Sequence, residues 1–77
     1  MEELLAYLAR QLVDEPDQVR VERQGREDGE LLLELHVAPD DVGKVIGKQG
    51  RIVRALRTVV KASAVRSGRR VHVEIAA

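Results

Sequence analysis

The chain is 77 residues long, contains no cysteine and has a single aromatic residue, Tyr7. A chain of this length forms one small domain and leaves little room for an enclosed catalytic cavity, so an enzyme is not expected. Without cysteine it can form neither a disulfide nor a cysteine zinc site. Its acidic, polar N-terminus predicts a cytoplasmic protein with no signal peptide or membrane span.

The formal net charge is zero, but the two halves of the chain differ strongly in charge. Residues 1–41 hold twelve acidic and four basic side chains, a balance of −8. Residues 42–77 hold nine basic side chains and one acidic side chain, Glu74, a balance of +8. A neutral protein with one basic half still presents a positive field, so an anionic partner is expected.

The chain begins with a predicted amphipathic helix. Leucines recur at helical spacing over residues 2–12, at Leu4, Leu5, Leu8 and Leu12. The segment DEPD, residues 14–17, ends this helix, because the residue before Pro16 avoids helical geometry.

Two alternating segments then predict a β-hairpin. Residues 18–24 place Val19 and Val21 on one face, and residues 30–37 turn their odd-numbered apolar residues inward, Leu31, Leu33, Leu35 and Val37. The segment GREDG, residues 25–29, supplies the turn between them. By the same alternation Leu32 faces outward, and we expect it to be an exposed apolar residue.

The basic half predicts two helices and a last strand. Pro39, Asp40 and Asp41 favour a helix start, with carboxylates in the first turn, and two later glycines keep this helix short. A longer helix over residues 51–65 has an apolar face and, roughly opposite it, four basic residues: Arg51, Arg54, Arg57 and Lys61. Residues 71–75 alternate again. The expected fold is therefore α+β, with the helices covering one face of a three-stranded sheet.

The segment GKVIGKQGRIVR, residues 43–54, carries the strongest functional signal. Two helices that meet through Gly-x-x-Gly need a tight turn, and glycine reaches positive φ at little cost. The second helix starts at this turn, so its unpaired N–H groups and positive dipole end lie there. With Lys48 on the turn, Lys44 before it and Arg51 and Arg54 after it, the segment predicts a convex site for a phosphodiester backbone.

Other glycine motifs do not fit these residues. In a phosphate-binding P-loop the spacing from Gly43 to Gly47 would be one residue longer, and Gln49 stands where that motif has Ser or Thr. The dinucleotide-binding spacing of glycines is also absent. We therefore expect no cofactor and no small-molecule substrate.

The same segment resembles the signature of K-homology (KH) domains. Val45-Ile46-Gly47-Lys48-Gln49-Gly50, followed by Val53 and Leu56, is similar to the V-I-G-x-x-G-x-x-I-x-x-L core of that family. The element order resembles the type II arrangement, α-β-β-α-α-β, and the resemblance covers essentially the whole chain, residues 1–77, as one KH domain. More narrowly, GKVIGKQGRIVRALRTVVKA looks like the small single-domain bacterial KH proteins of the KhpA family.

The resemblance implies an RNA-binding protein whose GxxG loop clamps about four unpaired nucleotides. The residues it assigns to RNA binding are Lys44, Ile46, Gly47, Lys48, Gln49, Gly50, Arg51 and Arg54. It implies a sheet whose first strand is central and base edges read by the strand 30–37. It also implies a groove floor formed by residues such as Val45, Ile46 and Val53, with a plain core role as an equal alternative for Val53. Since the chain lacks aromatic residues for base stacking, we expect weak, broad and salt-sensitive binding to single-stranded RNA.

The family also implies a cellular role and partners. Such proteins act in the cytoplasm as RNA chaperones or post-transcriptional regulators linked to cell shape and envelope homeostasis. They self-associate as a homodimer, and they pair as a heterodimer with a larger multidomain KH protein of the Jag type.

The two histidines do not indicate a metal site. His36 and His72 both face outward, and with the first strand central they would lie on opposite edges of the sheet, with no third ligand at a sensible spacing. Asp40 and Asp41 are interpreted as helix N-terminal residues rather than as a catalytic pair. No metal is expected.

Two alternatives stay open at this stage. In the first, the domain is an assembly subunit that mainly pairs with the larger KH partner, and RNA contact is secondary. In the second, residues 40–65 form a helix-turn-helix that binds duplex DNA, although two glycines at the turn argue against it.

Overall fold

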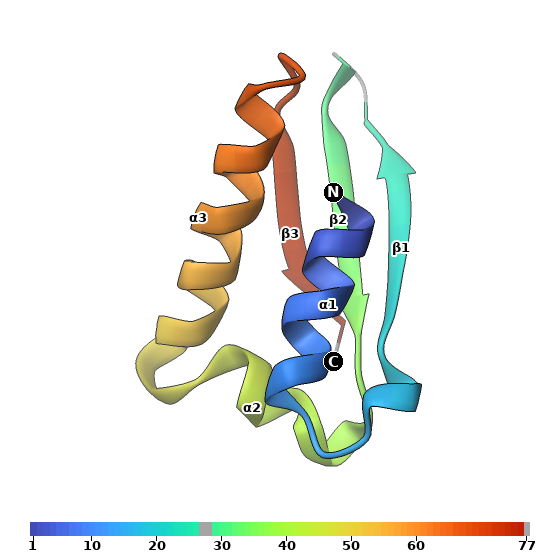
Figure 1. Ribbon diagram of the computed structural model, residues 1–77, viewed down its shortest axis with the longest axis vertical. Helices are drawn as coiled ribbons and strands as arrows, with labels where there is room; N and C mark the ends of the chain where they lie inside the picture. The colour runs from blue at the N-terminus through green and yellow to red at the C-terminus, as the bar shows by residue number, and fades with distance from the viewer. Residues whose placement is uncertain (27–28, 77) are drawn as a thin grey trace.

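The computed structural model describes residues 1–26 and 29–76 of the chain. The elements follow the predicted order of helix, strand, strand, helix, helix and strand (Figure 1). The helices and strands are α1 (Glu2–Leu12), β1 (Arg20–Gly25), β2 (Leu31–His36), α2 (Val42–Ile46), α3 (Arg51–Val65) and β3 (Val71–Ile75). Within the described residues, single turns of 3₁₀ helix join them at η1 (Pro16–Gln18), η3 (Pro39–Asp41) and η4 (Lys48–Gly50). The α+β class and the type II element order are confirmed.

The sheet is mixed, and its strand order is β1-β2-β3. β2 pairs antiparallel with β1, where Val21 is opposite Leu35, and parallel with β3, where Leu33 is opposite Val73. The central strand is therefore β2, and the expectation that the first strand is central was wrong. The physical reason is burial: β2 is mostly leucine and needs cover on both sides, whereas β1 reads RVERQG and is largely exposed.

The predicted hairpin is confirmed by the antiparallel register of β1 and β2. Next to the connection, the amide of Arg26 donates to the carbonyl oxygen of Glu30 at 2.8 Å. Residues 27–28 of the predicted turn lie outside the described residues.

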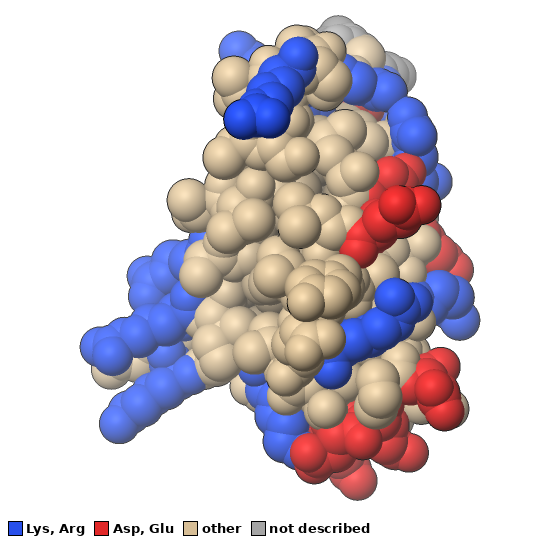
Figure 2. All heavy atoms as spheres, in the orientation of Figure 1, with Lys and Arg blue, Asp and Glu red and all other residues tan. Residues whose placement is uncertain are grey.

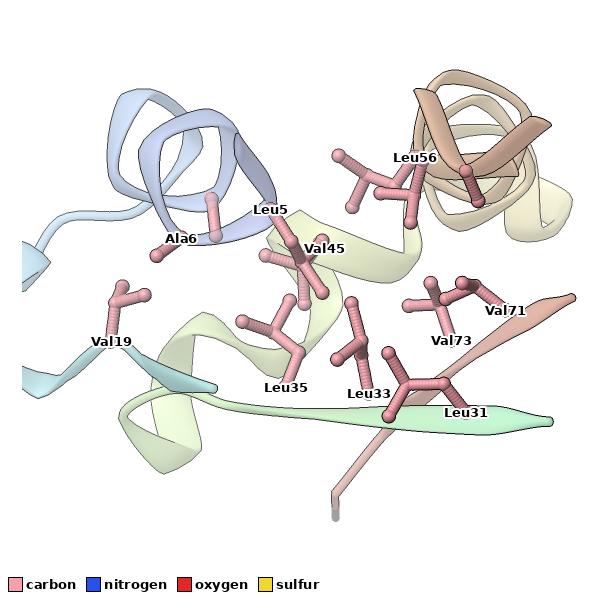
Figure 3. Packing of buried hydrophobic residues seen from close by; sticks show 13 residues of the cluster. Leu5, Ala6, Val19, Leu31, Leu33, Leu35, Val45, Leu56, Val71 and Val73 are labelled. Carbon is pink, nitrogen blue, oxygen red and sulfur yellow. The ribbon is translucent and has the colours of Figure 1, made fainter. Parts of the chain in front are cut away.

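All three α-helices pack on one face of the sheet, and the core lies between these two layers (Figures 1 and 3). Leu31, Leu33 and Leu35 point from β2 toward the helices, and Leu5 of α1 and Val45 of α2 come down to meet them (Figure 3). These five side chains are almost completely buried. Burial of an aliphatic side chain contributes about 1.5–3 kcal/mol to folding, so this aliphatic cluster is the main stabilising feature.

The buried face of α1 differs in detail from the predicted leucine stripe. Leu5, Ala6 and Ala9 are buried, whereas Leu12, at the last residue of the helix, is 37% exposed. The i, i+4 pair of Leu5 and Ala9 faces the sheet, and the alanines leave room for a close approach of the helix. None of the helices in the described part of the chain is both long enough and apolar enough to cross a membrane.

Leu32 corrects another expectation. It lies on the open face of the sheet, as the alternation predicted, but only 6% of it is exposed. Its neighbours in register are Gln24 on β1 and His72 on β3, and directly opposed side chains of adjacent strands are close enough to shield one another from solvent. Leu32 is therefore not an exposed apolar contact point.

Candidate nucleic-acid interface

The turn between α2 and α3 has the backbone geometry that the Gly-x-x-Gly spacing predicted. Gly47 has φ 77° and ψ 172°, and Gly50 has φ 72° and ψ 17°. Gln49 between them also has a positive φ, 57°. Three positive φ values within four residues reverse the chain between two helices in very little space.

The two glycines of the turn are required for different reasons. Gly47 adopts a backbone conformation essentially restricted to glycine, and a Cβ atom there would lie 2.6 Å from Cγ1 of Ile52. At Gly50 the nearest atom to such a Cβ is Cγ1 of Val53, at an ordinary 3.8 Å, so only its left-handed φ favours glycine. Gly47 therefore holds the turn against α3, and Gly50 keeps the start of α3 uncovered.

Two of the backbone amides in the turn are hydrogen-bonded within the protein. The amide of Gly47 donates to the carbonyl oxygen of Gly43 at 2.9 Å, and the amide of Gly50 donates to that of Gly47 at 3.1 Å. For the amides of Lys48 and Gln49, no backbone acceptor is found within residues 1–26 and 29–76. These two N–H groups are the turn's donors for an incoming anion.

Basic side chains surround this turn. Figure 2 shows them projecting at the lower left of the molecule, around the junction of α2 and α3. Arg54 donates from Nη2 to the carbonyl oxygen of Gln49 at 3.1 Å, and Arg51 lies 3.4 Å from Oε1 of the same residue. In the described part of the chain, no ion pair includes Lys48, Arg51 or Arg54. Their positive charge is available to a ligand.

Lys44 is placed differently from the other predicted contacts. Its ammonium group pairs with the carboxylate of Asp14 and lies 3.2 Å from Oδ1 of Asp41. The hydrogen bonds to Asp14 and then Asp41 raise the pKa of Lys44 above its ordinary value. Two carboxylates thus more than offset its charge, and Lys44 adds no free cation to the turn.

Asp41 anchors the start of α2 in a way that the sequence did not indicate. Its side chain is 1% exposed and makes no cap to its own helix. Instead, its two oxygens accept from the amides of Asp14, at 3.2 Å, and Glu15, at 3.1 Å. Burial alone would raise the pKa of Asp41, but these two bonds and the one from Lys44 outweigh it and lower the pKa. The carboxylate ties α2 to the segment after α1.

Of the three apolar residues expected to floor a groove, one is open to a ligand. Val45 and Val53 are buried in the protein, whereas Ile46, the last residue of α2, is 37% exposed. Val45 belongs to the main hydrophobic core, and the burial of Val53 agrees with the core role that was the alternative for it. Ile46 lies directly before the turn.

The strand expected to read base edges cannot do so with its backbone. β2 is central, so its main-chain groups are used in pairing with β1 and β3. The strand with a free edge beside α3 is β3 (Figure 1). There, Nε of Arg57 donates to the carbonyl oxygen of Val73 at 3.0 Å. A shallow hollow at this edge is lined by Arg57, Lys61, His72 and Val73, with Arg26 and Glu74.

Both histidines lie on the open face of the sheet, as expected, but not on opposite edges, because His36 belongs to the central strand. His72 lies 3.1 Å from Oε2 of Glu30. His36 lies beside two glutamates, Glu22 and Glu34. This second grouping was missed, although the Glu-x-His spacing at residues 34–36 places both side chains on one face of a strand.

Comparison with known proteins identifies the family of the chain. The family model described as "KhpA/KhpB, KH domain" matches residues 2–75. A protein of Clostridium acetobutylicum named RNA-binding protein KhpA is 56% identical over 75 residues, which cover 97% of this chain and 99% of the relative. Relatives with the same name in Treponema pallidum and Bacillus subtilis are 57% and 45% identical, over 96% and 97% of this chain and 91% of each relative.

The same fold occurs inside a larger protein of known structure. A crystal structure of Aquifex aeolicus Era aligns with 96% of this chain at a TM-score of 0.62 and 19% identity. The aligned part is 28% of the Era chain, and at this identity the likeness shows the fold alone. Taken with the full-length match of the family model, these relatives show that the chain belongs to the KhpA/KhpB family of KH domains.

Proposed function

We propose that this chain, as a single KH domain of residues 1–77, binds single-stranded RNA by clamping its backbone on the turn 47–50. The observation that carries the proposal is the turn, in which residues at positive φ join two helices. Lys48, Arg51 and Arg54 carry positive charge there, and no carboxylate of residues 1–26 and 29–76 pairs with them. The names of the relatives, which describe RNA-binding proteins, support the same function.

Each part of the turn has a distinct role in this proposal. The amides of Lys48 and Gln49 donate to phosphate oxygens, and the ammonium group of Lys48 supplies the charge. Arg51 and Arg54, in the first turn of α3, add to the positive end of the helix dipole. Glycine at position 50 leaves space for the sugar-phosphate backbone to approach closely. The function is binding, and no catalytic step is needed.

The bases lie beside the turn rather than on it. Ile46 offers an exposed apolar surface directly before the turn. From there the bases follow α3 toward the free edge of β3, where Arg57 and Lys61 line the hollow. The chain has no aromatic residue there on which a base could stack. Affinity therefore comes mainly from phosphates, is modest for one copy and falls with salt.

The cellular role follows from the family resemblance. On this proposal the protein works in the cytoplasm as an RNA chaperone or post-transcriptional regulator linked to cell shape and envelope homeostasis. It self-associates or pairs with a larger KH protein of the Jag type, and a second RNA-binding copy raises the effective concentration of sites along one RNA.

The test is fluorescence anisotropy with a labelled single-stranded RNA, over a series of salt concentrations. The variant Lys48→Asp/Gln49→Asp places carboxylates where phosphates would lie, and aspartate tolerates the left-handed conformation of residue 49. The matched control is Arg10→Asp/Gln11→Asp, which makes the same charge change at exposed positions of α1. Circular dichroism checks that both variants fold.

We expect the wild-type chain to bind and to weaken with salt, the loop variant to lose at least about 100-fold in affinity, and the control to stay within about threefold. Equal losses in both variants would mean that net charge, not the turn, carries binding. Absence of binding by the wild-type chain would contradict the proposed function.

A second candidate function is an assembly subunit in which RNA contact is secondary. Exposed apolar side chains on the helices favour it, because Tyr7 of α1 is 59% exposed, and Val59 and Val65 of α3 are 44% and 75% exposed. Figure 2 shows a broad uncharged surface over these two helices. If this function dominates, Lys48→Asp/Gln49→Asp abolishes RNA binding but leaves the association state in analytical ultracentrifugation unchanged.

A further inference from the structure

The open face of the sheet, on the side away from the helices, holds a group of three potential metal ligands. Glu34 and His36 lie on β2 two residues apart, so the alternation of a strand places them on one face. Glu22 on β1 is directly opposite Glu34 in the antiparallel register. A Glu-x-His pair on one strand, with a third ligand opposite it on the next, directs three side chains to one point.

The ligand atoms already lie at distances that fit one ion. Nε2 of His36 is 2.8 Å from Oε1 of Glu34 and 3.3 Å from Oε2 of Glu22. The three atoms lie within 4.8 Å of one another. Ligands about 2.1 Å from a zinc ion are separated by about 3.0–3.4 Å, depending on the coordination geometry. The 2.8 and 3.3 Å separations from His36 are therefore close to those that a shared ion requires.

The electrostatics of the group also favour a cation. Glu22 and Glu34 are like charges at directly opposed positions, an arrangement that destabilises an isolated strand pair. Arg20, at 3.3 Å from Glu22, supplies one positive charge to this pair. Glu74, opposite Glu34 on β3, is paired with Arg26 at 3.5 Å, so Glu34 has no arginine partner within the described residues. A divalent ion would neutralise Glu22 and Glu34 more completely than Arg20 does.

The strands hold the group on a rigid base. Glu34 and His36 are half-buried on the central strand. Glu34 is paired with both neighbouring strands, and His36, the last residue of β2, is paired with Arg20 of β1. Ligands on paired strands are positioned more accurately than ligands on loops.

We propose that Glu22, Glu34 and His36 form a site for a divalent transition-metal ion, with zinc as its representative. Imidazole nitrogen with carboxylate oxygens suits zinc, whereas magnesium and calcium prefer oxygen alone. Three protein ligands leave a coordination position for water or for a group from another molecule. The site lies across the sheet from the RNA-binding turn, and it does not depend on the proposed RNA function.

The experiment is a titration of the full chain with zinc chloride in a buffer without chelators. Isothermal calorimetry measures stoichiometry and affinity, and NMR follows the imidazole signals of both histidines. The variants are His36→Ala and Glu34→Gln, with His72→Ala as matched control, because His72 lies on the same face with a single glutamate neighbour, Glu30. Circular dichroism confirms that each variant folds.

We expect one zinc ion per chain and a selective change in the His36 ring signals. Affinity falls at least about tenfold in His36→Ala and in Glu34→Gln, and stays within about twofold in His72→Ala. Equal changes in both histidine rings, an affinity unaffected by His36→Ala, or no saturable binding by the wild-type chain would overturn the proposal. RNA binding by the turn is measured separately, so either proposal can fail alone.

Discussion

Lys44 and Lys48 are four residues apart in the sequence, but they lie in opposite electrostatic surroundings in the structure. Lys44 lies between the carboxylates of Asp14 and Asp41, and its charge is more than offset. Lys48 lies on the turn after α2, where no carboxylate of the described residues pairs with it. One lysine holds α2 in place, and the other presents charge to a ligand.

The comparison shows why a charge count over a sequence does not give the field at a site. The second half of the chain carries a balance of +8, but two of its basic residues, Lys44 and Arg70, pair with acidic residues from the first half. Pairing therefore decides which cations stay available, and three of those for which the described residues offer no carboxylate, Lys48, Arg51 and Arg54, lie at the GxxG turn. Figure 2 shows basic side chains at the lower left, around the turn, and others at the top and along the right side, where the acidic side chains also lie.

The largest effect on stability is expected from a substitution in the turn that carries Lys48. Gly47→Ala brings a Cβ atom against Ile52 and forces alanine into a conformation essentially restricted to glycine. We expect the free energy of unfolding to fall by about 2–4 kcal/mol in urea titrations.

Gly50→Ala is the matched control, because its added Cβ meets no close neighbour. It should cost about 1–2 kcal/mol, through its left-handed φ alone. A cost for Gly47→Ala no greater than that for Gly50→Ala would contradict the role assigned to the contact with Ile52.

The next largest effect on stability is expected at Asp41, the buried carboxylate that pairs with Lys44. Asp41→Asn keeps the shape of the side chain but removes its charge and one of its two acceptors, so the amide of Asp14 or Glu15 loses its partner. We expect the Tm in thermal unfolding to fall by about 10 °C. Asp40→Asn, at the exposed neighbouring position, should leave the Tm within about 2 °C. Similar shifts of the Tm in the two variants would contradict the proposal that Asp41 ties α2 to the segment after α1.

The pH dependence of stability tests the role of the Asp41 carboxylate independently. Because folding lowers the pKa of Asp41, its contribution is present above the ordinary aspartate value and is lost as the pH falls through the lower, folded value. The wild-type chain should therefore lose stability below about pH 4. In Asp41→Asn that part of the acid sensitivity should be absent, and an identical acid profile in both proteins would contradict the assignment.

Much of this molecule could be predicted from its sequence. The periodicity of apolar residues predicted the two longer helices and the strands, because hydrophobic spacing is a local property of the chain, and the residues at 39–41 predicted the start of the short helix. The glycines at positions 47 and 50 indicated positive φ for the same reason. The spacing of the turn, the family signature and the charge pattern together located the candidate RNA site.

The remaining features depend on contacts between distant residues. The central position of β2 follows from the burial of its leucines, and the open placement of Leu32 did not reveal that its neighbours cover it. The pairing of Asp41 with the amides of residues 14 and 15 spans more than twenty residues and has no local pattern. Glu22 reaches His36 only through the strand register.

The smallest effects are expected when each of the two lysines is neutralised separately. This comparison is also the most direct test of the central claim, that Lys48 presents charge to RNA and Lys44 does not. RNA affinity and its salt dependence are measured for the wild-type chain, Lys48→Gln and Lys44→Gln, with thermal unfolding of each. We expect Lys48→Gln to weaken binding severalfold and to reduce the salt slope by about 0.7, with little change in Tm. Lys44→Gln should lower the Tm and leave the salt slope unchanged. If Lys44→Gln reduces the salt slope as much as Lys48→Gln does, then pairing with Asp14 and Asp41 does not remove Lys44 from the RNA site, and the account is wrong.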